Sequence, residues 1–195
     1  MDRLSFGLLM GVISSPFYLA SWIVSAVVYG KWKLGSDSLS SLGCCGNASA
    51  EIVFNLGCSL TGLLVLFLGL SLFRYDDRLF RLSGCAVFVC TIALLGIGSV
   101  TEDYGTPHMV FACMYGTFAA ITIVLTGAGD YAEGDKSFTL MAAILLLICG
   151  TAWLTQPFGT FEPIAVSCIL TWTFIQSALM LFKKIRKERV SGTDH

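Results

Sequence analysis

Long runs without an ionisable side chain alternate with short charged or turn-rich segments along the whole chain. Windows free of Asp, Glu, Lys, Arg and His cover residues 4–30, 52–73, 82–101, 109–129, 137–161 and 163–182. The shortest is 20 residues long, and about 20 apolar residues cross the hydrocarbon core of a bilayer as a helix. Backbone groups in lipid must be hydrogen-bonded within their own segment, and the alternating pattern of barrel strands is absent, so we expect helices.

This pattern predicts an all-α, polytopic membrane helix bundle that forms a single domain over residues 1–195. We expect six transmembrane helices at residues 6–29, 52–73, 82–101, 108–128, 138–156 and 163–182, followed by a short basic cytoplasmic tail at 183–195. The connections between these windows are short. Any function must therefore reside among the helices or in these connections.

The basic residues predict the orientation. If the N-terminus is cytoplasmic, ten of the twelve Lys and Arg residues face the cytoplasm, and only Lys31 and Lys33 face the other side. Cytoplasmic connections of membrane proteins carry an excess of Lys and Arg. We therefore expect a multi-pass protein of the cell membrane with both termini in the cytoplasm.

Composition agrees with a membrane protein and excludes some functions. The chain is 55% hydrophobic and 13% charged, whereas soluble domains are about 25% charged. The net charge is −1, and no basic patch outside the tail suggests nucleic-acid binding. Of the eight cysteines, only Cys44 and Cys45 lie in a polar connection. We expect unpaired, packing cysteines, although the oxidation state of these two stays open.

The segment from Ser36 to Asn55 is the most informative polar stretch. It is small, polar and turn-rich, it contains Asp37, and its far end carries Glu51 and Asn55 into the second apolar run. A carboxylate and an amide four residues apart share one face of a helix. Here that face lies at the edge of a hydrocarbon layer, where unpaired polar groups are costly.

The predicted topology brings further ionisable residues to the same outer face. Glu102, Asp103 and His108 come from the connection between the third and fourth helices, and Glu162 comes from the last connection. A histidine near carboxylates can titrate close to neutral pH. We hypothesise catalytic roles for Glu102 and His108, and ligand-binding roles for Asp37, Glu51, Asn55 and Asp103. The alternative is that all are ordinary polar residues at helix ends.

Other chemistries find less support. His108 is the only histidine at the outer face, and there is no HExxH motif, so we predict no metal site and no cofactor. The serines around Ser40 lack a GxSxG nucleophile elbow.

The run LSSLGCCGNASAEIVFNLG at 39–57 resembles the signature of the DUF998 family, which comprises small prokaryotic, largely archaeal, multi-spanning membrane proteins of unknown function. The family pattern is a Leu-Ser-Asp-Leu-Gly motif, then Ser-Ala and Phe-Asn-x-Gly, and a later Gly-x-Phe-Pro-Glu followed by a histidine. The matching positions here are Leu39, Ser40, Leu42, Gly43, Ser49, Ala50, Phe54, Asn55, Gly57, Gly98, Glu102 and His108.

Two positions depart from this pattern. The family aspartate is Ser41 here, with Asp37 four residues upstream, and the family proline is Thr101. The resemblance implies no activity, but it singles out Asn55, Glu102 and His108.

These observations favour a protein that binds or processes a lipid or small amphiphile at a polar outer-leaflet site, with membrane lipids as partners. Whether it is an enzyme stays open. One alternative is a small transporter or channel, although the windows contain no Asp, Glu, Lys or Arg, which commonly mark ion paths. Another is a membrane scaffold or interaction subunit that packs through small residues such as Gly62 and Gly69. The oligomeric state also stays open.

Overall fold

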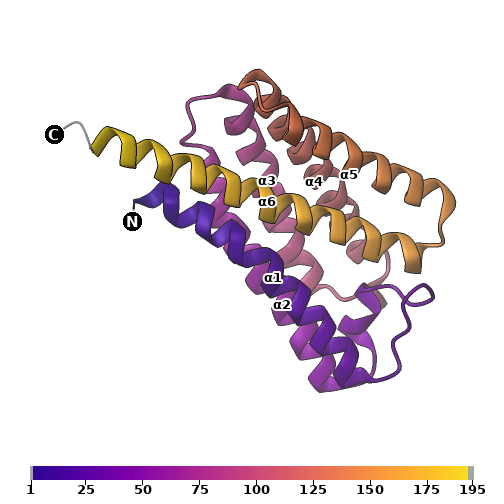
Figure 1. Ribbon diagram of the computed structural model, residues 1–195. Helices are drawn as coiled ribbons and strands as arrows, with labels where there is room; N and C mark the ends of the chain where they lie inside the picture. The colour runs from indigo at the N-terminus through magenta and orange to yellow at the C-terminus, as the bar shows by residue number, and fades with distance from the viewer. Residues whose placement is uncertain (1, 193–195) are drawn as a thin grey trace.

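The structure, a computed structural model, describes residues 2–192 and contains six long helices (Figure 1). They are α1 (Arg3–Tyr29), α2 (Ala48–Leu72), α3 (Arg78–Ser99), α4 (Thr106–Ala132), α5 (Lys136–Thr155) and α6 (Phe158–Gly192). Two short 3₁₀ turns, η1 (Ser40–Cys44) and η2 (Glu102–Tyr104), lie in connections. All six helices are long and apolar enough to cross a membrane, and residues 2–192 contain no strand. The prediction of an all-α, multi-pass membrane protein with six helices is confirmed.

Polar side chains fix where the first three helices begin. Asp2 accepts a hydrogen bond from the Ser5 amide at 2.9 Å, Asn47 accepts one from Ala50, and Asp77 accepts one from Leu79 at 2.7 Å. Asp and Asn at this position satisfy amides that have no partner within the helix. The sequence therefore defines these helix starts locally.

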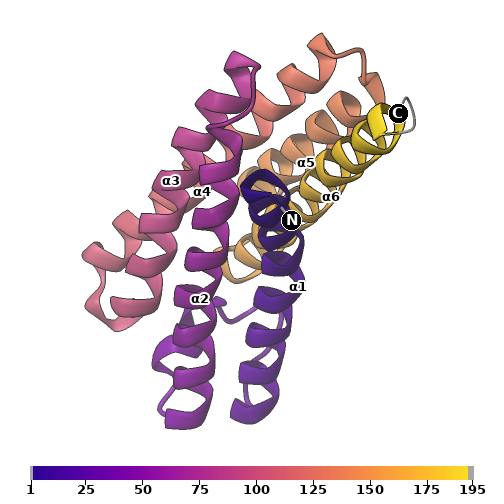
Figure 2. The ribbon, with the colours of Figure 1, turned by 90° about the vertical axis from the view of Figure 1, so that its left-hand side faces the viewer.

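The helices follow one another around the bundle (Figure 2). Helix α1 packs on α2 and α6, α2 packs on α3, and α3 packs on α4, while α5 contacts α4 and α6 from outside. Helices α4 and α6 touch each other only slightly. Close approach between α2 and its neighbours requires glycine, because a Cβ on Gly57 would lie 2.5 Å from the Cβ of Ser21, and one on Gly98 would lie 2.6 Å from the Asn55 carbonyl oxygen.

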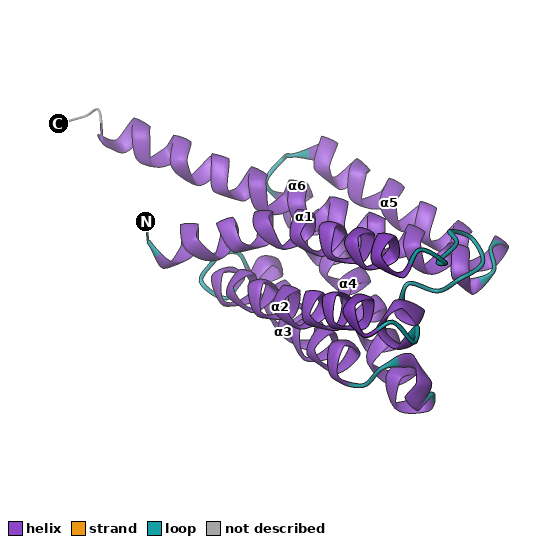
Figure 3. Ribbon diagram, turned by 90° about the horizontal axis from the view of Figure 1, so that it is seen from below, coloured by secondary structure: helices purple, strands orange, loops and turns teal. Residues whose placement is uncertain are grey.

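The start of α1 and the end of α6 lie at one end of the bundle, here called the terminal end (Figures 1 and 3). An ion pair between Asp2, which precedes α1, and Lys184 on α6 joins these two helices there. The opposite end, here called the loop end, carries η1, η2 and the α5–α6 connection. The cytoplasmic location of the terminal end stays a prediction.

The first connection folds back into the bundle at the loop end. Leu39 and Leu42 from this connection are 1% and 0% exposed, and they pack in one core cluster with Tyr18, Phe54 and Ile97. Full burial of a leucine side chain contributes about 1.5–3 kcal/mol. The connection is therefore part of the core and positions the polar residues around it.

Candidate functional site

Two carboxylates from distant parts of the chain hold the first connection at the loop end. Glu162 on α6 accepts hydrogen bonds from the Leu39 amide at 2.6 Å and from the Ser40 hydroxyl at 2.7 Å. Glu102 on η2 accepts one from the Ser38 hydroxyl at 2.8 Å. Charged acceptors make the stronger hydrogen bonds in proteins. These contacts tie the first connection to η2, between α3 and α4, and to α6.

Asn55 and His108 each have one satisfied and one unsatisfied polar atom. The Asn55 amide nitrogen donates to the Gly43 carbonyl at 3.0 Å, and His108 Nδ1 lies 2.6 Å from the Val100 carbonyl. With Nδ1 as the donor of this hydrogen bond, Nε2 is the ring nitrogen that remains for another partner. Asn55 Oδ1 and His108 Nε2 are buried without a hydrogen-bond partner in the described chain.

The other three predicted residues make local contacts. Asp37 accepts a hydrogen bond from the amide four residues earlier at 2.7 Å, and Glu51 accepts one from the amide five residues earlier at 2.6 Å. Asp103 accepts one from the hydroxyl two residues earlier. Glu102, Asn55 and Glu51 thus each contact a different part of the first connection, and Asp37 belongs to it. Roles in binding or catalysis for all six stay predictions.

Cys44 lies beside Glu102 and Asp103 in the same region. Burial raises the pKa of its thiol, and the negative charge of Asp103 acts in the same direction. A thiol with a raised pKa carries little thiolate at neutral pH, and thiolate is the reactive form. Nucleophilic chemistry at Cys44 is therefore not favoured.

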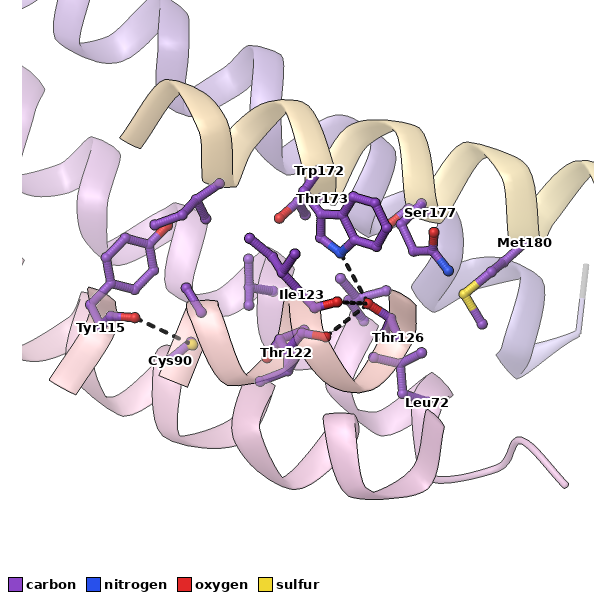
Figure 4. A pocket seen from close by; sticks show the side chains of 16 residues that line it. Leu72, Cys90, Tyr115, Thr122, Ile123, Thr126, Trp172, Thr173, Ser177 and Met180 are labelled. Carbon is purple, nitrogen blue, oxygen red and sulfur yellow. Dashed lines mark hydrogen bonds between the residues drawn. The ribbon is translucent and has the colours of Figure 1, made fainter. Parts of the chain in front are cut away.

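A cavity of about 50 Å³ lies in the centre of the bundle, between α2, α3, α4 and α6 (Figure 4). Its wall is mostly apolar, with residues such as Leu72 and Met180. On one side the Trp172 indole donates to the Thr126 hydroxyl at 3.0 Å, and that hydroxyl donates to the Thr122 carbonyl at 2.8 Å. None of the six residues predicted from the sequence lines this cavity.

Gln176 on α6 is the unsatisfied polar group of this wall. Its side chain lines the cavity, the residue is 5% exposed, and neither its nitrogen nor its oxygen has a hydrogen-bond partner among the described residues. Buried polar groups in proteins are nearly always hydrogen-bonded, because leaving one unpaired costs about 1–3 kcal/mol. The amide therefore marks a place where a ligand would find both a donor and an acceptor.

A buried carboxylate lies toward the terminal end from this cavity. Asp130 follows Thr126 by one turn on α4, is 1% exposed, and has no hydrogen-bond partner for either oxygen within residues 2–192. The Gln176 amide interacts with the Asp130 carboxylate between α4 and α6, without meeting the full geometry of a hydrogen bond. Buried carboxylates without a partner are rare in proteins and often functional.

The sequence matches a known protein family. A family model described as a protein of unknown function, DUF998, matches residues 12–179. The chain belongs to this family. No curated protein and no solved structure matches it. Since the activity of DUF998 proteins is unknown, a function for this member has to be inferred from its own geometry.

Sequence reasoning gave no role to two residues that matter in this DUF998 protein. Glu162 was placed at the outer face only, because its contact with Ser40 spans 122 residues and depends on how the first connection folds. The charge-free window ends at residue 129, which predicts that Asp130 lies outside the helix, whereas α4 continues to Ala132. The four-residue spacing of Thr122, Thr126 and Asp130, which places all three on one helix face, was the signal available.

Proposed function

We propose that this DUF998 protein binds a lipid or another small amphiphile, with one end of the ligand held in the central cavity. The observation that carries the proposal is the Gln176 amide, which is buried and unpaired in an otherwise apolar wall. Ligand sites in proteins are typically apolar hollows with a few polar groups that fix orientation. An amphiphile supplies both the apolar surface and the polar atom that such a wall needs.

The size of the cavity limits what enters it. A cavity of about 50 Å³ corresponds to about three to five water molecules, at about 10–15 Å³ each. The buried part of the ligand is therefore short, such as the end of an acyl chain or a small polar group. The rest of the ligand lies outside the cavity.

Helix packing suggests the entry route. Helices α4 and α6 both line the cavity; their backbones come close at few points, the Trp172–Thr126 hydrogen bond bridges them, and α5 contacts both from outside. Helix α5 faces away from the bundle, with Leu147 and Leu154 70% and 82% exposed. Outward movement of α5, together with opening of the Trp172–Thr126 hydrogen bond, would give an amphiphile a path from the membrane between α4 and α6.

The test is to fill the cavity and identify what the protein retains. Ala119 lines the cavity and is 4% exposed, so Ala119→Phe places a ring in the space that the ligand would occupy. Full-length protein is purified in a mild detergent, and the co-purifying amphiphiles are extracted and quantified by mass spectrometry. We expect a species that the original protein retains in stoichiometric amount and Ala119→Phe does not.

Ala128→Phe is the matched control, because Ala128 lies on the same helix and is exposed. It should retain the same species as the original protein. Identical extracts from all three proteins would contradict binding in the central cavity. Folding of Ala119→Phe is verified by its elution as a single species and by its cooperative unfolding.

A second candidate is a lipid site at the loop end, where Glu102, His108, Asn55, Glu51, Asp37 and Asp103 gather polar groups. The buried, unpaired Nε2 of His108 and Oδ1 of Asn55 favour it. Under this proposal, Glu102→Gln or His108→Ala leaves the bundle folded but abolishes a change in the lipids of cells that produce the protein. Lipid profiles that are the same in both variants and in a deletion strain would exclude it.

A further inference from the structure

Three carboxylates gather where α4 turns into α5, at the terminal end of the bundle. Asp130, Glu133 and Asp135 each place an oxygen within 4.8 Å of the others. The turn is tight, because Gly134 has φ +89° and the Asp135 amide bonds to the Asp130 carbonyl at 2.8 Å. Three oxygens 4.8 Å apart each lie about 2.8 Å from their common centre, close to the roughly 2.3–2.6 Å of Ca²⁺–oxygen contacts, so a small inward movement of the side chains lets one hard cation contact all three.

The burial of these carboxylates differs in a way that points to a ligand. Glu133 is exposed and Asp135 is partly buried, whereas Asp130 is 1% exposed. Both Asp130 oxygens lack a hydrogen-bond partner in the described part of the chain. Removing a carboxylate from water without a compensating partner is costly. The exposed side of the cluster gives a solvent path to its buried member.

One protein cation already contacts part of this cluster. The Lys183 ammonium on α6 lies 3.0 Å from Glu133 and also pairs with Asp135. It bonds to neither oxygen of Asp130. Tyr75, from the α2–α3 connection, is a further neighbour of the cluster. The three carboxylates carry three negative charges; the Lys183 ammonium balances one of them, whereas a divalent cation in its place would balance two.

We propose that Asp130, Glu133 and Asp135 form a binding site for a hard divalent cation, such as Ca²⁺ or Mg²⁺, and that the cation displaces the Lys183 ammonium from it. Carboxylate oxygens are the preferred ligands of these ions. Lys183 acts as an internal competitor that holds Glu133 and Asp135 in place when the cation is absent. This site adjoins the central cavity at Gln176, but none of its three carboxylates lines that cavity.

Isothermal titration of the full-length protein in detergent, after removal of chelator, tests the proposal with CaCl₂ and MgCl₂ in separate runs. We expect one saturable site for at least one of the two cations. Asp130→Asn keeps the shape of the side chain and should weaken binding at least about tenfold. Lys183→Met removes the competitor and should tighten binding about fivefold.

Two control variants separate this site from other effects. Asp76→Asn removes an exposed carboxylate at the same end of the bundle and should bind the cation as the original protein does. Ala119→Phe should also bind normally, because the central cavity takes no part. Three results would overturn the proposal: no saturable binding by either the original protein or Lys183→Met, unchanged affinity in Asp130→Asn, or equal weakening in Asp76→Asn.

Discussion

Glu162 at the loop end and Asp130 at the terminal end are both carboxylates on long helices of the same bundle. Glu162 accepts hydrogen bonds from Leu39 and Ser40, whereas neither Asp130 oxygen has a partner among the residues described. The first carboxylate therefore holds a connection in place, and the second leaves negative charge uncompensated. The difference shows that burial of a carboxylate in a membrane bundle does not by itself indicate a binding site. The donors that surround it decide which role it has.

The largest expected effect comes from Glu162→Ala. This substitution leaves the buried Leu39 amide and Ser40 hydroxyl without an acceptor, and each such group costs about 1–3 kcal/mol. We expect the free energy of unfolding to fall by about 3 kcal/mol, measured by reversible unfolding in mixed detergent micelles. Glu162→Gln, which keeps an acceptor oxygen, should lose less than half as much. If Glu162→Ala had the same free energy of unfolding as the original protein, Glu162 would not hold the connection in place.

Asp130→Asn should stabilise the protein, in contrast to Glu162→Ala. Removing a buried charge that lacks a partner should raise the free energy of unfolding by about 1–2 kcal/mol in the presence of chelator. The same unfolding assay measures it, with Asp76→Asn as the control that should change little. A clear loss of stability in Asp130→Asn would show that the carboxylate is already satisfied in the folded protein.

Glu102→Ala tests the weaker of the two contacts to the first connection. Its bond to the Ser38 hydroxyl is only partly buried, so the expected loss in unfolding free energy is about 0.5–1.5 kcal/mol. Asp103→Ala, at the exposed neighbour, should stay within about 0.5 kcal/mol of the original protein. Equal losses in the two variants would argue against a specific role for Glu102 in holding the connection.

Asp2→Asn should give the smallest effect, and one that depends on pH. The hydrogen bond from Lys184 lowers the pKa of Asp2. A carboxylate with a lowered pKa in the folded state stabilises the fold above its unfolded pKa of about 4, and this contribution is lost as the pH falls toward the folded value. Asn keeps the helix cap but removes the ion pair. The melting temperatures of the two proteins should therefore differ slightly at pH 7 and converge in acid.

Much of this architecture follows from the sequence, because charge-free windows of sufficient length have few alternatives to membrane helices. The same rule fails at Asp130, because a window that ends before the first charged residue cannot predict that the helix continues beyond that residue. Contacts such as Glu162 with Ser40 depend on the path of a connection without regular periodicity. Of the candidate site, the sequence therefore predicted the residues at the loop end but neither the central cavity nor the acidic cluster.

Hydrogen–deuterium exchange of the full-length protein compares the two ends within one molecule and tests the central difference most directly. The Leu39 amide is buried and bonded to Glu162, whereas Glu133 and Gly134 lie in an exposed turn. The expected result is that residues 38–44 exchange at least about tenfold more slowly than residues 133–136, because slow exchange follows the stability of local structure. Equal exchange rates in the two connections would contradict the account.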